Sequence, residues 1–309
     1  MESKTDECLS VFNVDGSMRK SCKSNLLQEF KLDPVAETPV DHISIVDMGM
    51  IWRMATPSKE DRETKRRDGR SYLWNDYLDK ICSMVMARHS TAKLIILVND
   101  KYDLEYSIKA DEHQRRAAKY QKIPNVFPKP EDEFPGGTDF NKLMVKCANK
   151  VRLQKLVMEQ MSAHVGEVNG TIIYCTGETA INLTTGEPER HFRFNHTEAD
   201  SILLSVYAEL QEIGHAEVVV LDSEDTDVYV QASYVSNEVA GDLMIRRKDH
   251  LVRCSTMLPA DVANYHFMSS VVVTIPLVSL ATERRSYCAS VRKTLKQWTY
   301  FLMLEKEGS

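Results

Sequence analysis

An α/β fold with a mainly parallel central sheet is the fold class that the sequence predicts. Three short runs rich in β-branched and aliphatic residues, 42–47, 93–98 and 218–221, have the composition of buried strands. Segments with helical spacing of apolar residues lie between them. Acidic residues stand at or just past the end of each run. In an open α/β sheet such residues converge, because the ligand site lies beyond the carboxyl ends of parallel strands.

The first half of the predicted domain begins after a polar stretch. Residues 1–35 are polar and aperiodic, which predicts a flexible N-terminal tail. A strand is expected at 42–47. The charged run 59–70 is compatible with a solvated helix and with a mobile loop. Apolar residues at helical spacing then predict a helix over 72–88, and the second strand follows at 93–98.

The middle of the chain combines a basic segment with a break. A basic helix is expected over 109–122, and the proline-rich interval 124–135 ends it. We expect this region to form a cap or arch over the acidic edge, through which a single strand of nucleic acid could pass. One long helix is expected over 139–161, because its apolar residues keep to one broad face. Residues 171–174 then predict a strand of a ribbon.

A helix and a strand complete the predicted core unit. The helix covers 198–213 and ends at Gly214, and the strand covers 218–221. We therefore place one domain at 36–264.

Composition limits the class of protein. With 309 residues, 43% of them hydrophobic and 27% charged, the chain can bury one sizeable core with appendages. Seven cysteines without zinc-type spacing indicate free thiols and an intracellular setting, nuclear or cytoplasmic. No apolar run reaches membrane-spanning length and no signal peptide opens the chain. The formal charge of −6 means that nucleic-acid contacts must come from local basic patches.

Two carboxylate pairs, each straddling one residue, give the clearest functional signal. One pair opens a predicted helix, the other follows a predicted strand, and single acids follow two further strands. Anions gathered this closely are tolerable only if cations neutralise them, and carboxylates are the ligands of hard divalent ions. The sequence therefore predicts a Mg²⁺ or Mn²⁺ site, with these ligands: Asp47, Asp100, Glu198, Asp200, Asp225 and Asp227.

Each of these acids has a simpler interpretation when it is taken alone. Asp225 and Asp227 suit a strand-ending turn with Asx-type hydrogen bonds. The pair that opens the helix suits the positive end of the helix dipole. Asp47 and Asp100 could cap whatever follows them. Only the ordered conjunction of all six favours a metal site.

With these motifs the chain resembles the flap endonuclease family of PIN-like nucleases over roughly residues 41–264. That family has an Asp after its first strand, an Asp ending the second, a Glu-x-Glu that opens a helix, and a Ser/Thr-Glu-Asp-x-Asp after the next strand. Here Asp200 stands in place of the second Glu. The chain looks closer still to animal proteins associated with mobile elements, which carry a Glu-Ala-Asp helix start and an Asp-Thr-Asp strand end.

The resemblance implies a three-layer α/β/α PIN-like fold and a metal-dependent phosphodiesterase that acts on single-stranded or branched DNA or RNA. Two ions roughly 4 Å apart would hold the attacking and leaving oxygens. The family places a lysine and an arginine on the helix behind the second acid, facing the scissile phosphate. Lys101, Arg115 and Arg116 are the corresponding cations here.

The last segment, 265–309, departs from the family. After its Asp-x-Asp pair the family continues with a strand and a Gly-Cys-Asp motif that completes the metal cluster, and then a Gly-x-Gly turn that grips the DNA backbone. No such motif follows Ala263. The codons that encode Asn264 to Arg285, taken from the third base, are compatible with Gly-Cys-Asp-His-Thr and Gly-His-Gly-Lys-Lys. This compatibility indicates a frameshift, in the gene or in the gene model, near Asn264.

Three functions remain open at this point. The first is the phosphodiesterase, weakened by loss of the last Asp. The second is a catalytically inactive PIN-like remnant that binds nucleic acid or protein. The third is a nucleotide-sugar transferase that holds a metal-bound diphosphate with Asp225 and Asp227, a reading that gives no role to Asp47 and Asp100.

Overall fold

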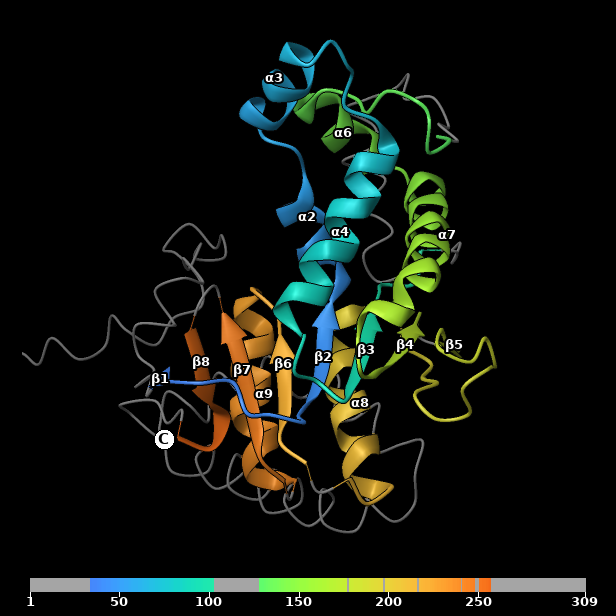
Figure 1. Ribbon diagram of the computed structural model, residues 1–309. Coiled ribbons are helices and arrows are strands. Elements are labelled where there is room, and N and C mark those ends of the chain that lie inside the picture. Colours follow the sequence, from blue (N-terminus) through green and yellow to red (C-terminus); the bar gives the residue numbers. More distant parts are fainter. Residues whose placement is uncertain are drawn as a thin grey trace, which may run out of the picture.

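One mixed sheet organises the chain. The computed structural model describes residues 34–102, 128–176, 178–196, 198–215, 217–239, 241–247 and 250–256. The described residues form an α/β fold with a single eight-stranded sheet, in the order β1-β8-β7-β6-β2-β3-β4-β5, and seven α-helices (Figure 1). The predicted fold class, α/β with a mainly parallel sheet, is thereby confirmed.

The elements have these bounds. The strands are β1 Pro34–Val35, β2 Ile43–Asp47, β3 Leu94–Val98, β4 Thr171–Cys175, β5 Ala180–Asn182, β6 Val219–Asp222, β7 Leu243–Arg247 and β8 His250–Arg253. The helices are α2 Met48–Ala55, α3 Lys59–Arg67, α4 Trp74–Arg88, α6 Gly137–Leu143, α7 Cys147–His164, α8 Ala199–Glu212 and α9 Thr226–Glu238. Short 3₁₀ turns cover Val165–Glu167 and Cys254–Thr256.

The strand order contains a switch point beside β2. The strands β7, β6, β2, β3 and β4 pair in parallel, whereas β1, β8 and β5 join antiparallel at the two sides. From β2 the chain proceeds outward through β3 and β4 and then returns to β6 on the other side of β2. In open α/β sheets, ligands bind outside the carboxyl ends of the strands at such a reversal. Topology therefore points to the ends of β2 and β6.

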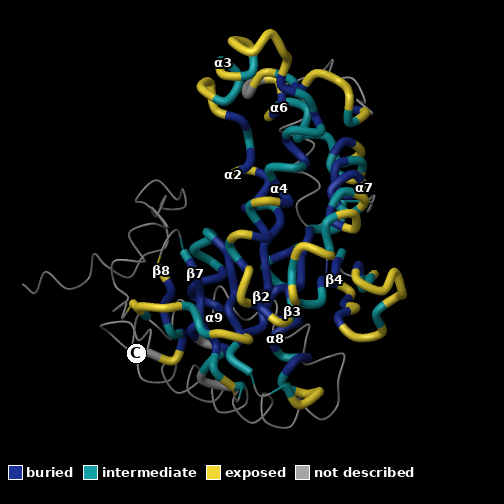
Figure 2. Tube along the Cα trace, in the orientation of Figure 1, coloured by how far each residue is buried: buried dark blue, intermediate teal, exposed yellow. Residues whose placement is uncertain are grey.

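The sheet separates two apolar cores. Alternate residues of β2 face opposite sides: Ile43 and Ile45 pack with α8 and α9, and Val46 packs with α2, α4 and α7. All five residues of β2 are buried, as expected for a central parallel strand that is covered on both faces. Four of the five residues of β3 and all four of β6 are buried as well, and Figure 2 shows β2 and β3 as largely buried.

One of the two cores extends away from the sheet. The helices α4 and α7 extend beyond the strands, and α3 and α6 lie at their far end (Figure 1). Five aromatic rings pack together there, with Tyr77 and Phe134 centroids 4.7 Å apart. Polar contacts hold α3 to α4, including Lys65 to Asp76 at 2.7 Å and Lys80 to Asp61 at 2.9 Å. The other three rings are Tyr72, Trp74 and Phe140.

Several predicted boundaries need correction. The single helix expected over 139–161 is wrong, because the chain breaks between Leu143 and Cys147 into α6 and α7. Phe140 belongs to the aromatic cluster, whereas α7 packs against α4, so one straight helix does not serve both contacts. The side-chain amide of Asn149 donates to the Leu143 carbonyl at 2.9 Å and satisfies the freed end of α6. The charged run at 59–67 is a helix.

Three further differences concern the N-terminal tail, the segments outside the described residues and the elements after β6. Pro34–Val35, placed by the sequence in the tail, form β1 and pair with β8. The basic segment 109–122 and the atypical segment 265–309 lie outside the described residues. No element was predicted for the interval that forms α9, β7 and β8.

We expect Gly170→Ala to destabilise the fold by about 1–3 kcal/mol, the range for an overpacked site. A Cβ on Gly170 would lie 2.6 Å from the Ala92 carbonyl oxygen and 2.8 Å from that of Lys93, both backbone atoms. Gly166→Ala is the matched control, because a Cβ there meets no described atom within 4 Å. Urea unfolding of both variants measures the difference. Equal free energies of unfolding would contradict the prediction and show that the backbone around Ala92 and Lys93 can shift to accept the added methyl group.

Candidate functional site

The carboxyl edge of the parallel strands gathers most of the predicted acids. Asp47 is the last residue of β2 and pairs in register with Val98, the last residue of β3, so Asp100 follows at the same edge. Asp225 comes three residues after the end of β6, which pairs with β2. Three helices, α2, α8 and α9, begin beside these acids.

Asp47 is the most buried of these carboxylates. It is 7% exposed and caps α2, since its Oδ1 accepts the backbone N–H groups of Gly49 at 2.9 Å and Met50 at 3.3 Å. Its Oδ2 accepts the hydroxyl of Ser223 at 3.3 Å. Burial raises the pKa of Asp47 to about 6 against the opposing N–H bonds, and the nearby charge of Asp100 raises it further. Burial, more than the neighbouring acid, therefore disfavours the ionised form of Asp47.

Asp100 links β3 to two helices. Its Oδ1 accepts the N–H of Ala199, the first residue of α8, at 2.7 Å. Its Oδ2 accepts the hydroxyl of Tyr102 at 2.7 Å, and its carbonyl accepts the Gln154 side-chain amide at 2.7 Å. Burial, and then the charge of Asp100, raise the pKa of the Tyr102 hydroxyl far above its usual value. Asp100 is therefore held in a fixed position beside the start of α8.

Glu198 and Asp200 flank that same point. Glu198 is the residue before α8, and Asp200 lies in its first turn. Because Asp100 binds the N–H of the residue between them, these three acids belong to one neighbourhood. The start of α8 therefore lies beside the end of β3.

The β6–α9 loop joins the cluster through Ser223. Asp225 caps α9 by accepting the N–H of Asp227 at 2.9 Å, and its own N–H donates to the Ser223 hydroxyl oxygen at 3.2 Å. The same hydroxyl donates to Asp47. Ser223 therefore connects the acid that ends β2 with the acidic loop after β6.

Of the three predicted phosphate-facing cations, Lys101 lies among the described residues. Lys101 is 12% exposed, and its Nζ lies 2.8 Å from Oε1 of Glu178 in the turn before β5. Its charge is engaged by that carboxylate. Arg115 and Arg116 lie outside the described residues.

The donor set fits a hard divalent cation in its chemistry. All the acids offer carboxylate oxygens, which are the ligands that hard divalent cations prefer. Among the described residues, however, no three His, Cys, Asp or Glu side chains converge closely enough to hold an ion. Asp47, Asp100 and Asp225 accept helical N–H groups instead, which are the positive ends of helices. A carboxylate oxygen has a second lone pair, so capping and metal binding are compatible.

An open cleft adjoins this edge. It has a volume of about 480 Å³ and lies between α2 and the start of α9. Arg53 supplies a cation to its wall, and Met50 and Met54 supply an apolar surface. A phosphate-bearing ligand could therefore reach Asp225, which also lines the cleft. The remaining lining residues are Glu224 and Thr226.

Three residues of the site escaped the sequence reasoning. Ser223 stands in the Ser-Glu-Asp-x-Asp pattern, but the pattern alone gives the serine no role at the site. Tyr102 and Gln154 support Asp100 through contacts that no spacing rule reveals, because Gln154 lies 54 positions further along the chain.

We compared the chain with known protein families and with curated proteins. No model of a known protein family matches this chain, and no curated protein shows significant similarity to it. In the part of the chain that the structure describes, no helix is both long and apolar enough to cross a membrane.

Proposed function

We propose that this chain is a metal-dependent phosphodiesterase of the PIN-like, flap endonuclease-like kind, acting on DNA or RNA with Mg²⁺ or Mn²⁺. The observation that carries the proposal is the meeting of Asp47, Asp100 and the Ser223–Asp225 loop at the switch point of a parallel sheet. A three-layer α/β/α PIN-like arrangement is part of the same proposal. Helices on both sides of the sheet support it.

The residues have distinct roles in this proposal. A bound divalent ion would polarise the phosphate and activate the attacking water. Asp47, Asp100 and Asp225 would hold the ion after their side chains shift closer together, because as they stand no three of the described acids converge on one point. Glu198, Asp200 and Asp227 would be the nearby acids that complete the charge. Arg53, on the wall of the cleft, would attract the phosphate of the nucleic acid.

An inactive remnant is the alternative within the same fold. The resemblance implies that a further Asp belongs to the cluster, and the frameshift indicated near Asn264 would remove it. Metal binding then becomes weaker and cleavage is lost, because small errors of geometry at a catalytic centre reduce rates by orders of magnitude. Nucleic-acid or protein binding would be the remaining activity.

Metal binding is the first expected outcome. Mn²⁺ added to the full chain should stabilise it against urea by about 2.7 kcal/mol at a hundredfold excess over Kd. Asp100→Asn should abolish this response. Glu159→Gln is the matched control, since Glu159 is an exposed acid on α7 that contacts Lys155. An equal response in both variants would contradict the proposal.

Cleavage separates the enzyme from the remnant. The full chain is incubated with single-stranded and branched oligonucleotides in Mg²⁺ or Mn²⁺, with EDTA as the control. Metal-dependent cleavage that Asp100→Asn removes identifies the enzyme. Metal binding without cleavage identifies the remnant, and the variant that restores the alternative frame after Ala263 should then recover activity.

A further inference from the structure

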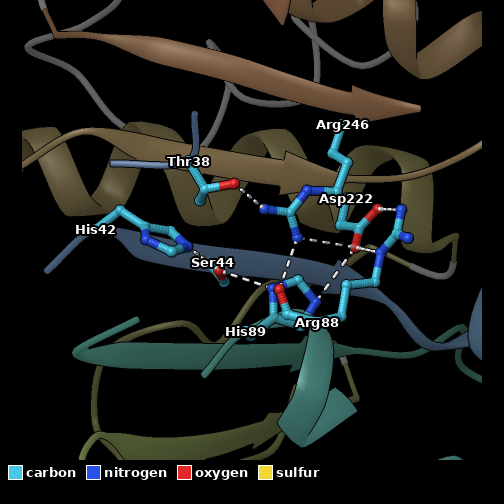
Figure 3. A network of polar contacts seen from close by, with 7 residues as sticks. All are labelled: Thr38, His42, Ser44, Arg88, His89, Asp222 and Arg246. Atoms are coloured by element: carbon cyan, nitrogen blue, oxygen red, sulfur yellow. Dashed lines mark hydrogen bonds and ion pairs between the residues drawn. The ribbon is translucent and has the colours of Figure 1, made fainter. Parts of the chain in front are cut away.

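Seven polar residues form one network behind the acidic edge (Figure 3). They come from β2, β6, β7, the end of α4 and the segment that precedes β2. Asp222, His89 and Ser44 have exposed fractions of 0%, and Arg246 is 7% exposed. Burying so many polar groups is unfavourable unless their contacts are made. The members are Thr38, His42, Ser44, Arg88, His89, Asp222 and Arg246.

Asp222 is the centre of the network. Arg88 binds it with two nitrogens, Nη2 to Oδ1 at 2.9 Å and Nε to Oδ2. Burial opposes ionisation of Asp222, but contacts with His89 and Arg88 outweigh it and hold the pKa of the carboxyl below its usual value. A bidentate contact of this kind fixes orientation as well as charge.

His89 binds the neighbouring strand. Its Nδ1 lies 2.9 Å from the Ser44 hydroxyl and its Nε2 lies 3.2 Å from Asp222 Oδ2. Serine, histidine and aspartate in this order also occur in hydrolytic triads. Here none of the three is exposed, and the serine hydroxyl contacts His42 as well, so no substrate reaches them. The role of the network lies inside the protein.

Arg88, the last residue of α4, and His89, which directly follows it, thus hold the two strands that carry the acidic edge. Arg88 holds β6 through Asp222, and His89 holds β2 through Ser44. The backbone pairing of β2 with β6 ends at Val46 and Asp222. The next residues, Asp47 and Ser223, are those that contact each other.

We propose that Arg88 and His89 are positioning residues, which hold Ser223 against Asp47 by fixing Asp222 and Ser44. This inference rests on the proposed function as far as it concerns metal. Past Asp222 no strand pairing guides the β6–α9 loop, so the side chain of Asp222 sets the direction in which Ser223 and Asp225 leave the sheet. Arg246 supports Arg88 by donating to its carbonyl at 2.8 Å.

Fold stability alone does not account for the network. Buried ion pairs gain little net stability, because desolvation offsets their attraction, and apolar residues of similar volume often serve as well. Outer contacts that orient metal ligands typically change metal affinity 10–100-fold. A positioning role therefore predicts a larger effect on the site than on the fold.

The test compares two charge-conserving variants of the full chain. Arg88→Lys keeps the charge but cannot make the two-point contact. Arg253→Lys is the matched control, because Arg253 contacts Asp242, just before β7 at the opposite edge of the sheet. Free Mn²⁺ is measured by electron paramagnetic resonance, and hydrogen exchange is measured at the amide of Asp225, which donates to Ser223.

We expect Arg88→Lys to weaken Mn²⁺ affinity about tenfold or more and to speed exchange at Asp225, with neither change in Arg253→Lys. If the unchanged chain binds no Mn²⁺, the proposed function fails, and the exchange measurement alone decides the inference. Unchanged exchange at Asp225 in Arg88→Lys overturns it. If that variant does not fold, His89→Gln tests the β2 contact by the same two measurements.

Discussion

Asp47→Asn should raise the free energy of unfolding at pH 8 by about 1–3 kcal/mol, although it removes a central residue of the site. Burial and Asp100 raise the pKa of Asp47 from 3.8 to about 6, and each unit of such a shift corresponds to about 1.4 kcal/mol. A raised carboxyl pKa contributes stability below the unfolded value, and this contribution is lost as pH rises through about 6. Asparagine also caps helices well, so α2 keeps its cap.

Urea unfolding in EDTA at pH 8 and pH 4 measures the effect. The stabilisation by Asp47→Asn should be present at pH 8 and small at pH 4, where the wild-type carboxyl is mostly protonated in the folded protein. Asp76→Asn gives the opposite sign, because burial of Asp76 is outweighed by contacts with Leu73 and Lys65 that lower its pKa. A loss of stability in Asp47→Asn at pH 8 would show that its charge is already compensated.

The same variant should lose its response to Mn²⁺. A side chain that destabilises the fold at neutral pH and binds metal is an example of stability given up at a functional site. An Asp47→Asn protein that is both more stable and fully responsive to Mn²⁺ would remove Asp47 from the site, because the charge would then have no functional consequence.

Local periodicity predicted the strands and helices around the site well, because their apolar residues follow the period of each element. The break between Leu143 and Cys147 could not be predicted, since it depends on Phe140 joining rings that come from Tyr72 and Phe134. The spacing of apolar residues within one segment carries no information about partners that are distant in the sequence. The short strand β1 has only two residues and depends on β8 for its existence.

The acids were found because their order along the chain follows the order of the strands. The residues that hold these acids in place could not be predicted from the sequence. Arg88 and Asp222, for example, are 134 positions apart, and neither stands in a recognisable pattern. Asp47 caps α2 through Oδ1 and still contacts Ser223 through Oδ2, so capping does not remove it from the acidic edge.

The second large effect that we expect is a loss of folding stability at acidic pH. It arises from a buried chain of polar contacts that runs from Pro39 to Asp222, which we call the relay. Four contacts join the Pro39 carbonyl, His42, Ser44, His89 and Asp222, at 2.7, 2.8, 2.9 and 3.2 Å. Both ends are acceptors, so four hydrogens are needed, and two neutral imidazoles with one hydroxyl supply three. The contact of His89 Nε2 with Asp222, at 3.2 Å, is an ion-pair contact without the geometry of a hydrogen bond, and within the described residues Nε2 has no hydrogen-bond partner.

A fourth proton would complete the relay, but its charge is unfavourable there. Two positive charges, those of Arg88 and Arg246, already lie near the single negative charge of Asp222. Burial lowers the pKa of His42 to about 4 against the Pro39 carbonyl, and His89 and Arg246 lower it further, while Asp41 opposes. Burial likewise lowers the pKa of His89. A lowered histidine pKa contributes stability above the unfolded value, near 6.5, and this stability is lost as pH falls from there toward 4.

We therefore expect the free energy of unfolding to fall by about 3 kcal/mol as pH is lowered from 6.5 to 4, because His42 takes up a proton more readily in the unfolded chain. In the wild-type chain Asp47 gains stability over nearly the same interval and masks this loss. The comparison is consequently made in the Asp47→Asn background, with and without His42→Gln, by urea unfolding at half-unit steps of pH. The single variant should lose stability on acidification and the double variant should lose distinctly less. Identical slopes would mean that the pKa of His42 is the same in the folded protein as in the unfolded chain, and burial in the relay would then not lower it.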